Sequence, residues 1–165
     1  MNHTPRKAQW YSLAIGIFAA DQAAKTYIDM TTPLGWSRDV TPFFNLVHVL
    51  NPGAAFSFLA DAGGWQRWFF TIFAVGVSVM LVVWLRKVRL TTEPILAIAL
   101  ALVLSGAVGN VIDRIEHGYV VDFIHVHWQQ AYFPAFNIAD SAVTVGVILM
   151  FLASVFARKP EVSDV

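Results

Sequence analysis

Four runs of apolar residues organise this sequence. They cover residues 8–28, 66–85, 94–112 and 138–157, approximately. A run of about 20 apolar residues is long enough to cross the hydrocarbon core of a bilayer as a helix. The pattern therefore predicts four transmembrane helices in a single membrane domain that covers residues 1–165.

The first run could instead be a secretory signal peptide. Two basic residues precede it, and Phe18-Ala19-Ala20 fits the region before a cleavage point. We favour a retained helix, because the apolar run continues to Ile28. Its removal would also leave three spans, with the two termini on opposite sides.

Basic residues flank the four runs unevenly. Cytoplasmic loops near membrane spans carry an excess of Lys and Arg, so the side with more of them is expected to be cytoplasmic. We therefore expect both termini in the cytoplasm and the connections at about 29–65 and 113–137 outside. Seven of the eleven basic residues lie on the cytoplasmic side in this arrangement: Arg6, Lys7, Arg86, Lys87, Arg89, Arg158 and Lys159.

The two outer connections contain segments typical of β-strands. Residues 43–50 and 119–128 are rich in β-branched and aromatic side chains. Asn51-Pro52-Gly53, which follows the first segment, is a turn signal. The expected fold is thus an α-helical integral membrane protein whose small extracytoplasmic sheet and loops lie on the membrane surface.

Composition excludes several functional classes. Hydrophobic residues make up 57% of the chain and charged residues 13%, which fits a membrane protein. The net charge is zero, so no overall field attracts nucleic acid. The absence of cysteine excludes disulfides, thiolate metal ligands and a cysteine nucleophile.

Charged residues inside the spans are the first candidates for function, because each costs about 2.5–3.5 kcal/mol on insertion scales. Asp21 and Lys25 are four residues apart on one helix face and can form an ion pair. Asn110, Asp113 and Arg114 collect at the outer end of the third helix. A helix cap with a local salt bridge and a clamp for a substrate are both open interpretations of this group.

Asp122 is the most informative acidic residue. Strand alternation places it on the same face as Val120 and Ile124, where an unpaired carboxylate is unfavourable. The nearest expected partner is Asp140, another acid at the same depth, about one strand and one turn later. Asn137 already fills the cap position of the fourth helix, so we expect Asp140 a turn deeper. Two close carboxylates do not both ionise readily, and such a pair can activate a water and protonate a leaving amine.

A metal site and a transporter are the alternatives. His117, His125 and His127 could bind a metal, but alternation separates the last two from Asp122, and the sequence has no HExxH motif. We therefore expect no metal and no cofactor, and these histidines have no assigned role. The alternative function is a small proton-coupled transporter or channel subunit with aspartates as proton relays. A non-enzymatic membrane assembly factor is a third possibility.

Five short motifs occur in the order seen in the lipoprotein signal peptidases, and the sequence resembles this family over nearly its whole length. The family, also called signal peptidase II or prolipoprotein signal peptidase, consists of bacterial membrane aspartyl peptidases. The motifs are Asp21-Gln22-x-x-Lys25, Asn51-x-Gly53-Ala54-Ala55-Phe56-Ser57, Gly109-Asn110-x-x-Asp113-Arg114, Gly118-x-Val120-x-Asp122-Phe123 and Phe136-Asn137-x-Ala139-Asp140-Ser141.

The resemblance implies roles for these residues. Asp122 and Asp140 would be the catalytic pair, and Asp21 with Lys25 a structural polar pair. Leu50 and Pro52 depart from the family, which commonly has an aromatic and a small polar residue there, so the shape of that loop is open. The residues expected to bind substrate or support the site are Asn51, Gly53, Asn110, Asp113, Arg114 and Asn137.

The resemblance also implies a substrate and a location. Members of the family cleave signal peptides from diacylglyceryl-modified prolipoproteins, just before the lipidated cysteine, without a metal or other cofactor. They are inhibited by the cyclic peptide globomycin. We accordingly expect a monomer in the bacterial cytoplasmic (inner) membrane, in contact with membrane lipid, with its active site near the outer membrane–water interface.

Overall fold

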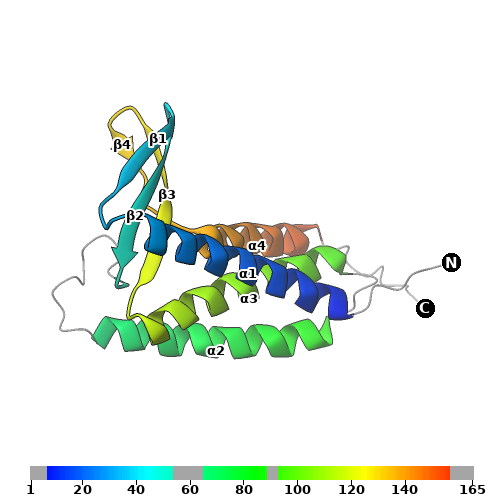
Figure 1. Cartoon of the computed structure of the whole chain (residues 1–165). Helices are drawn as coiled ribbons and strands as arrows, with labels where there is room; N and C mark the ends of the chain where they lie inside the picture. The colour runs from blue at the N-terminus through cyan, green and yellow to red at the C-terminus, as the bar shows by residue number, and fades with distance from the viewer. Residues whose placement is uncertain (1–6, 54–64, 89–92, 157–165) are drawn as a thin grey trace, which may run out of the picture.

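The computed structural model describes residues 7–53, 65–88 and 93–156. It has four helices and a small sheet, which confirms the predicted fold class (Figure 1). Residues 54–57 of the second motif lie outside the described residues, as do the basic residues Arg6, Arg89, Arg158 and Lys159. The elements are α1 (Lys7–Thr31), β1 (Ser37–Thr41), β2 (Phe44–Asn51), α2 (Trp65–Lys87), α3 (Pro94–Glu116), β3 (Val120–Trp128), β4 (Ala131–Tyr132) and α4 (Ile138–Val155).

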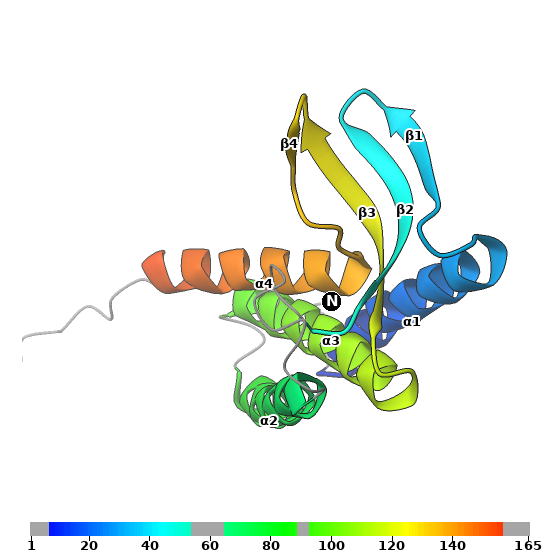
Figure 2. The same ribbon diagram turned by 90° about the vertical axis from the view of Figure 1, so that its left-hand side faces the viewer.

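Helix α3 is the centre of the bundle, and the other three helices pack against it (Figure 2). The contacts that α3 makes change from apolar to polar along its length. Toward its N-terminal half it packs on α2 through a purely apolar cluster, whereas its last turns carry the polar residues of the third motif. The apolar cluster consists of Leu81, Leu85, Val88, Ala97, Leu100, Val103 and Leu104.

Two glycines allow α3 and α4 to approach closely. A Cβ added at Gly106 would overlap the carbonyl oxygen of Ala139 and lie 2.7 Å from Val143 Cγ2. From the other side, a Cβ at Gly146 would lie 2.8 Å from the carbonyl oxygen of Ala99. Small residues at helix contacts are typical of membrane bundles, where close van der Waals packing stabilises association.

The outer faces of α2 and α4 are apolar and exposed, as expected for surfaces that contact lipid. Phe73 and Phe151, for example, are 63% and 68% exposed. Within the described ranges, α2, α3 and α4 are each long and apolar enough to cross a membrane. Helix α1 is equally long but carries Asp21 and Lys25, so its assignment as the fourth span stays a prediction.

The sheet lies across one end of the bundle, and its strands run transverse to the helix axes (Figure 1). Its order is β1-β2-β3-β4, with each neighbouring pair antiparallel. Strands β2 and β3 correspond to the two segments expected from sequence, whereas β1 and β4 were not predicted. Helix α1 begins, and α4 ends, at the end of the bundle opposite the sheet.

Helix α1 holds the base of the sheet through one apolar and one polar contact. Ile28 packs with Val121 and Phe123 of β3 in a buried cluster. His48 of β2 is 3% exposed; its Nδ1 lies 3.0 Å from the carbonyl oxygen of Thr32, and its Nε2 lies 3.3 Å from Asp29 Oδ1. The sheet is therefore fixed to the end of α1 as well as to the chain that leads into it.

We predict that Gly106→Ala destabilises the bundle by about 1–3 kcal/mol, because the added methyl group forces backbone atoms of α3 and α4 apart. Gly76→Ala is the matched control, since nothing lies within 4 Å of the position of its Cβ. Thermal unfolding in detergent, followed by tryptophan fluorescence, measures both. Equal midpoints for the two variants would contradict the packing described here.

Candidate active site

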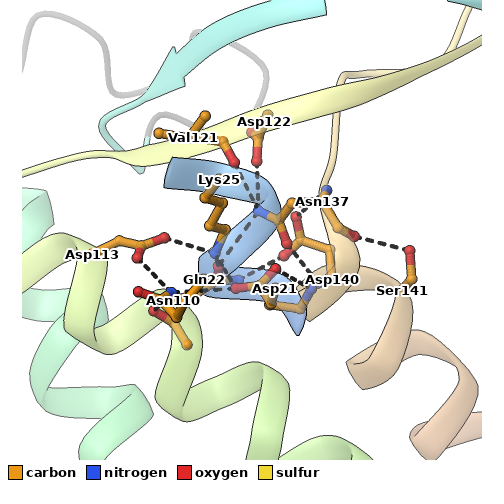
Figure 3. A network of polar contacts seen from close by, with 12 residues as sticks. Asp21, Gln22, Lys25, Asn110, Asp113, Val121, Asp122, Asn137, Asp140 and Ser141 are labelled. Carbon is orange, nitrogen blue, oxygen red and sulfur yellow. Dashed lines mark hydrogen bonds and ion pairs between the residues drawn. The ribbon is translucent and has the colours of Figure 1, made fainter. Parts of the chain in front are cut away.

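The polar residues singled out in the sequence meet where the sheet joins the bundle (Figure 3). They come from α1, β2, β3, α3 and the start of α4, and they form one continuous network of hydrogen bonds and ion pairs. Several of its members are almost completely buried, among them Asp21, Lys25, Asp113, Asp122 and Asn137.

Asn137 connects the two aspartates that the sequence analysis paired. It is fully buried and is the N-cap of α4, where its Oδ1 accepts a hydrogen bond of 2.9 Å from the backbone N–H of Asp140. Its Nδ2 donates to Asp122 Oδ1 at 2.7 Å. One amide side chain thus binds the carboxylate on β3 and the backbone of the residue that carries the other carboxylate.

Asp122 accepts a second hydrogen bond, of 3.0 Å, from Asn51 Nδ2 at the end of β2. The Asn51 side chain is oriented in turn by the backbone N–H of Gly53, which donates to its Oδ1 at 2.9 Å. Gly53 has a φ of +93°, which favours glycine, so the predicted turn is present. The loop therefore aims one amide donor at Asp122.

The environment of Asp122 favours its protonated form. Burial and, after it, the negative charge of Asp140 raise the pKa of Asp122 to about 6, against the opposing effect of the hydrogen bonds from Asn51 and Asn137 and the charge of Lys25. The carboxyl group of Asp122 consequently titrates about two pH units above its ordinary range. This property suits a group that must both hold and release a proton.

Asp140 lies in the first turn of α4 and has two functions in the local structure. Its Oδ1 accepts a hydrogen bond of 2.8 Å from Asn110 Nδ2, and its Oδ2 accepts one of 3.3 Å from the backbone N–H of Asn137. The second bond completes a capping box. The helix-cap interpretation, which the sequence analysis set aside in favour of a deeper position, is therefore part of the observed structure.

Below the two aspartates, Lys25 lies between two carboxylates. Its Nζ is 2.7 Å from Asp21 Oδ2 and 2.6 Å from Asp113 Oδ2, and it donates to Asn110 Oδ1 at 2.9 Å. Asp21 Oδ1 accepts a hydrogen bond of 2.8 Å from the backbone N–H of Ala139. The expected pair of Asp21 and Lys25 is thus a triad with Asp113, and it links α1, α3 and α4.

Arg114 completes the cationic side of the site. Its Nη1 donates to the carbonyl oxygen of Asn110 at 3.2 Å, and its charge interacts favourably with those of Asp140, Asp122 and Asp113. Among the described residues, its Nε has no hydrogen-bond partner, although that atom is buried. The salt bridge within the third motif considered from sequence does not form, because Asp113 pairs with Lys25 of α1 instead.

The histidines considered as metal ligands lie elsewhere. His125 and His127 stack against Tyr132 of β4, and His117 stacks on Tyr119. In the part of the chain that the structure describes, no three His, Asp or Glu side chains are arranged to hold a metal ion. The described network contains four carboxyl groups, four amide side chains and two cations, Lys25 and Arg114.

Two residues of this region received no role in the sequence analysis. Gln22 donates to Asp113 Oδ1 at 2.8 Å, and Arg67 of α2 binds the last turn of α3. Gln22 belongs to the first motif, so its place beside Asp21 was a usable signal. Arg67 is an isolated cation at the start of an apolar run, which is also typical of an interfacial anchor.

Comparison with known proteins decides the family. The sequence model for Signal peptidase (SPase) II matches residues 13–156. The chain belongs to the signal peptidase II family. Its members are aspartic-type membrane peptidases, and this chain is a multi-pass bacterial membrane protein of that type. Peptidase function thus prevails over the transporter and assembly-factor alternatives.

Similar proteins match over most of their length. The lipoprotein signal peptidase of Shewanella woodyi is 51% identical over 147 residues, covering 89% of this chain and 83% of that protein. The lipoprotein signal peptidase of Cellvibrio japonicus is 50% identical over 154 residues, covering 93% and 89%. A bacterial membrane enzyme solved by the in meso method at 2.3 Å resolution matches with a TM-score of 0.80 and 33% identity, covering 93% of each chain.

We predict that Lys25→Met destabilises the protein by about 3–5 kcal/mol, because it leaves Asp21 and Asp113 buried without their cation. Asp113→Asn should cost less, since the pair of Lys25 and Asp21 survives. Lys87→Met, at an exposed position near the end of α2, is the control for removal of a lysine. Thermal unfolding in detergent compares the stabilities of the three variants. A Lys25→Met variant as stable as the Lys87→Met control would refute the prediction.

Proposed function

We propose that this peptidase removes signal peptides from diacylglyceryl-modified prolipoproteins by cleaving before the lipidated cysteine, with Asp122 and Asp140 as its catalytic pair. The observation that carries the assignment is the double contact of Asn137, which binds the carboxylate of Asp122 and the backbone of Asp140. The proposed substrate class agrees with the relatives, which are lipoprotein signal peptidases.

In the proposed reaction, the two carboxyl groups share one proton. The ionised group takes a proton from water as the water oxygen attacks the scissile carbonyl carbon. The protonated partner donates a hydrogen bond to the developing oxyanion and then transfers its proton to the leaving amine. The amides of Asn51 and Asn137 hold Asp122 in place during these steps. No covalent intermediate is required.

The cationic and amide groups around the pair would bind the substrate. The buried Nε of Arg114, which has no partner in the described part of the chain, is a free donor for a substrate carbonyl oxygen. Asn51, Gly53 and Asn110 would support the pair from the loop and from α3. Asp113, with Asp21 and Lys25, would contribute through the ion triad rather than by touching substrate.

The proposed placement has the sheet and the aspartates at the outer membrane–water interface, with both termini in the cytoplasm. Two features support it: the exposed apolar faces of α2 and α4, and the position of the sheet that carries Asp122 at one end of the bundle. The acyl chains of the substrate would remain among the helices and lipids while its peptide reaches the aspartates. The enzyme would act as a monomer and would be inhibited by globomycin.

We predict that Asp122→Asn and Asp140→Asn each lower kcat by at least about 100-fold, because either change removes one of the two proton-transferring groups. Cleavage of a diacylglyceryl-modified prolipoprotein by purified protein in detergent measures the loss. Asp39→Asn, an exposed carboxylate on β1 of the same sheet, is the matched control and should retain full activity. Cleavage that survives both substitutions in the pair, with folding intact, would refute the catalytic assignment.

The pH profile is a separate test. Because the pKa of Asp122 is raised to about 6, the free enzyme loses the shared proton as the pH rises through that value. We therefore expect kcat/KM to decline above about pH 6, by up to tenfold per pH unit. Bound substrate excludes water and raises the pKa of Asp122 further, so the corresponding decline in kcat should occur at higher pH. A kcat/KM that is constant between pH 5 and 8 would contradict the shared proton.

A further inference from the structure

Arg67, in the first turn of α2, holds the C-terminal turn of α3. Its Nε donates to the carbonyl oxygen of Arg114 at 2.7 Å, and its Nη2 donates to that of Ile115 at 2.9 Å. The last carbonyl groups of a helix have no amide partner within the helix, and a cation near them is favoured by the helix dipole. Arg67 thus supplies from another helix the donors that α3 itself lacks.

The chain that leaves α3 is shaped to accept this guanidinium. Gly118 has a φ of +87°, and a Cβ at that position would lie 3.0 Å from Arg67 Nη1. The guanidinium also lies over the ring of Trp68, with its Cζ 5.1 Å from the ring centroid. The planar guanidinium is therefore fixed from several sides, and its two hydrogen bonds have a defined direction.

The turn held by Arg67 carries Arg114, the cation that faces the two aspartates. Arg114 has only one hydrogen bond from its side chain to the described residues, to the carbonyl oxygen of Asn110. Among the described residues, this guanidinium is therefore hydrogen-bonded only to its own helix, so a shift of the last turn of α3 would move it. Another aromatic residue of α2, Phe70, has its Cδ2 3.2 Å from the position of a Cβ at Gly53, so α2 also supports the loop that carries Asn51.

We propose that Arg67 is a positioning residue for Arg114: it fixes the backbone from which the Arg114 guanidinium reaches the substrate. The proposal rests on the role of Arg114 in substrate binding given under Proposed function. Arg67 itself touches neither aspartate among its described contacts, and it acts only through the turn of α3. The contribution of α2 to the site is then the placement of a cation that belongs to another helix.

The test is a double-mutant cycle on prolipoprotein cleavage in detergent. Arg67→Met keeps the length of the side chain but removes both donors, and we expect it to raise KM by about 10-fold with less than about a twofold change in kcat. Arg67→Lys, which supplies a single point donor, should restore part of the loss. Lys87→Met, at an exposed position in the last turn of α2, is the control and should leave both constants unchanged.

The cycle is completed by making Arg67→Met in an Arg114→Lys background. Arg114→Lys keeps the charge but loses the planar donor group. If Arg67 acts through Arg114, Arg67→Met has little further effect on KM in the Arg114→Lys background. The same rise in KM in both backgrounds, or no rise in either, overturns the proposal. An Arg114→Lys enzyme with unchanged KM would instead refute the substrate-binding role of Arg114. Should Arg67→Met fail to fold, Arg67→Lys takes its place in the cycle and is judged by the same criterion.

Discussion

The amide of Asn137 imposes the geometry on which the rest of the site depends. An amide has one end that donates and one that accepts, and here the nitrogen faces the carboxylate of Asp122 while the oxygen faces the backbone N–H of Asp140. The same side chain therefore caps the start of α4 and attaches β3 to the bundle. An aspartate at this position would cap the helix equally well, but it would turn a carboxylate toward Asp122.

The charges around this amide favour the retention of a proton by Asp122. Four carboxylates, those of Asp21, Asp113, Asp122 and Asp140, face two cations, Lys25 and Arg114. A buried cluster with excess negative charge is stabilised when one carboxyl group binds a proton. Lys25 offsets one of the two charges of Asp21 and Asp113, and Arg114 offsets one of the two charges of Asp122 and Asp140, so each group keeps one excess negative charge.

The sequence was sufficient for the features that have a local pattern. Apolar runs predicted the helices, the content of β-branched and aromatic residues predicted β2 and β3, and alternation predicted the burial of Asp122. It was insufficient where a feature depends on partners far along the chain. Strand β1, with the sequence Ser-Arg-Asp-Val-Thr, is an exposed edge strand without apolar alternation, and β4 has only two residues. Neither strand has a sequence pattern that identifies it without knowledge of the strand with which it pairs.

The polar contacts show the same limit. The spacing of Asp21 and Lys25 predicted their pairing, but the third member, Asp113, lies on another helix. Arg67 likewise binds carbonyl oxygens of a helix whose side chains give no sign of the contact. The cap of α4 was misjudged for a different reason. The sequence analysis assigned the cap to Asn137 alone, whereas Asn137 and Asp140 form it together.

The irregularity in the ladder between β2 and β3 has a consequence for how the site tolerates change. Leu46 pairs with Ile124, but Val49 pairs with Asp122, so β2 contains one residue more than its partner over this stretch. Side chains alternate between the two faces of a strand. This additional residue therefore moves every later side chain of β2 to the opposite face of the sheet. It is the reason that Asn51, rather than Leu50, shares a face with Asp122. The number of residues between Leu46 and Val49 is therefore constrained as well as their identity, and a deletion of one residue there would exchange the amide for a leucine without altering a single residue of the site.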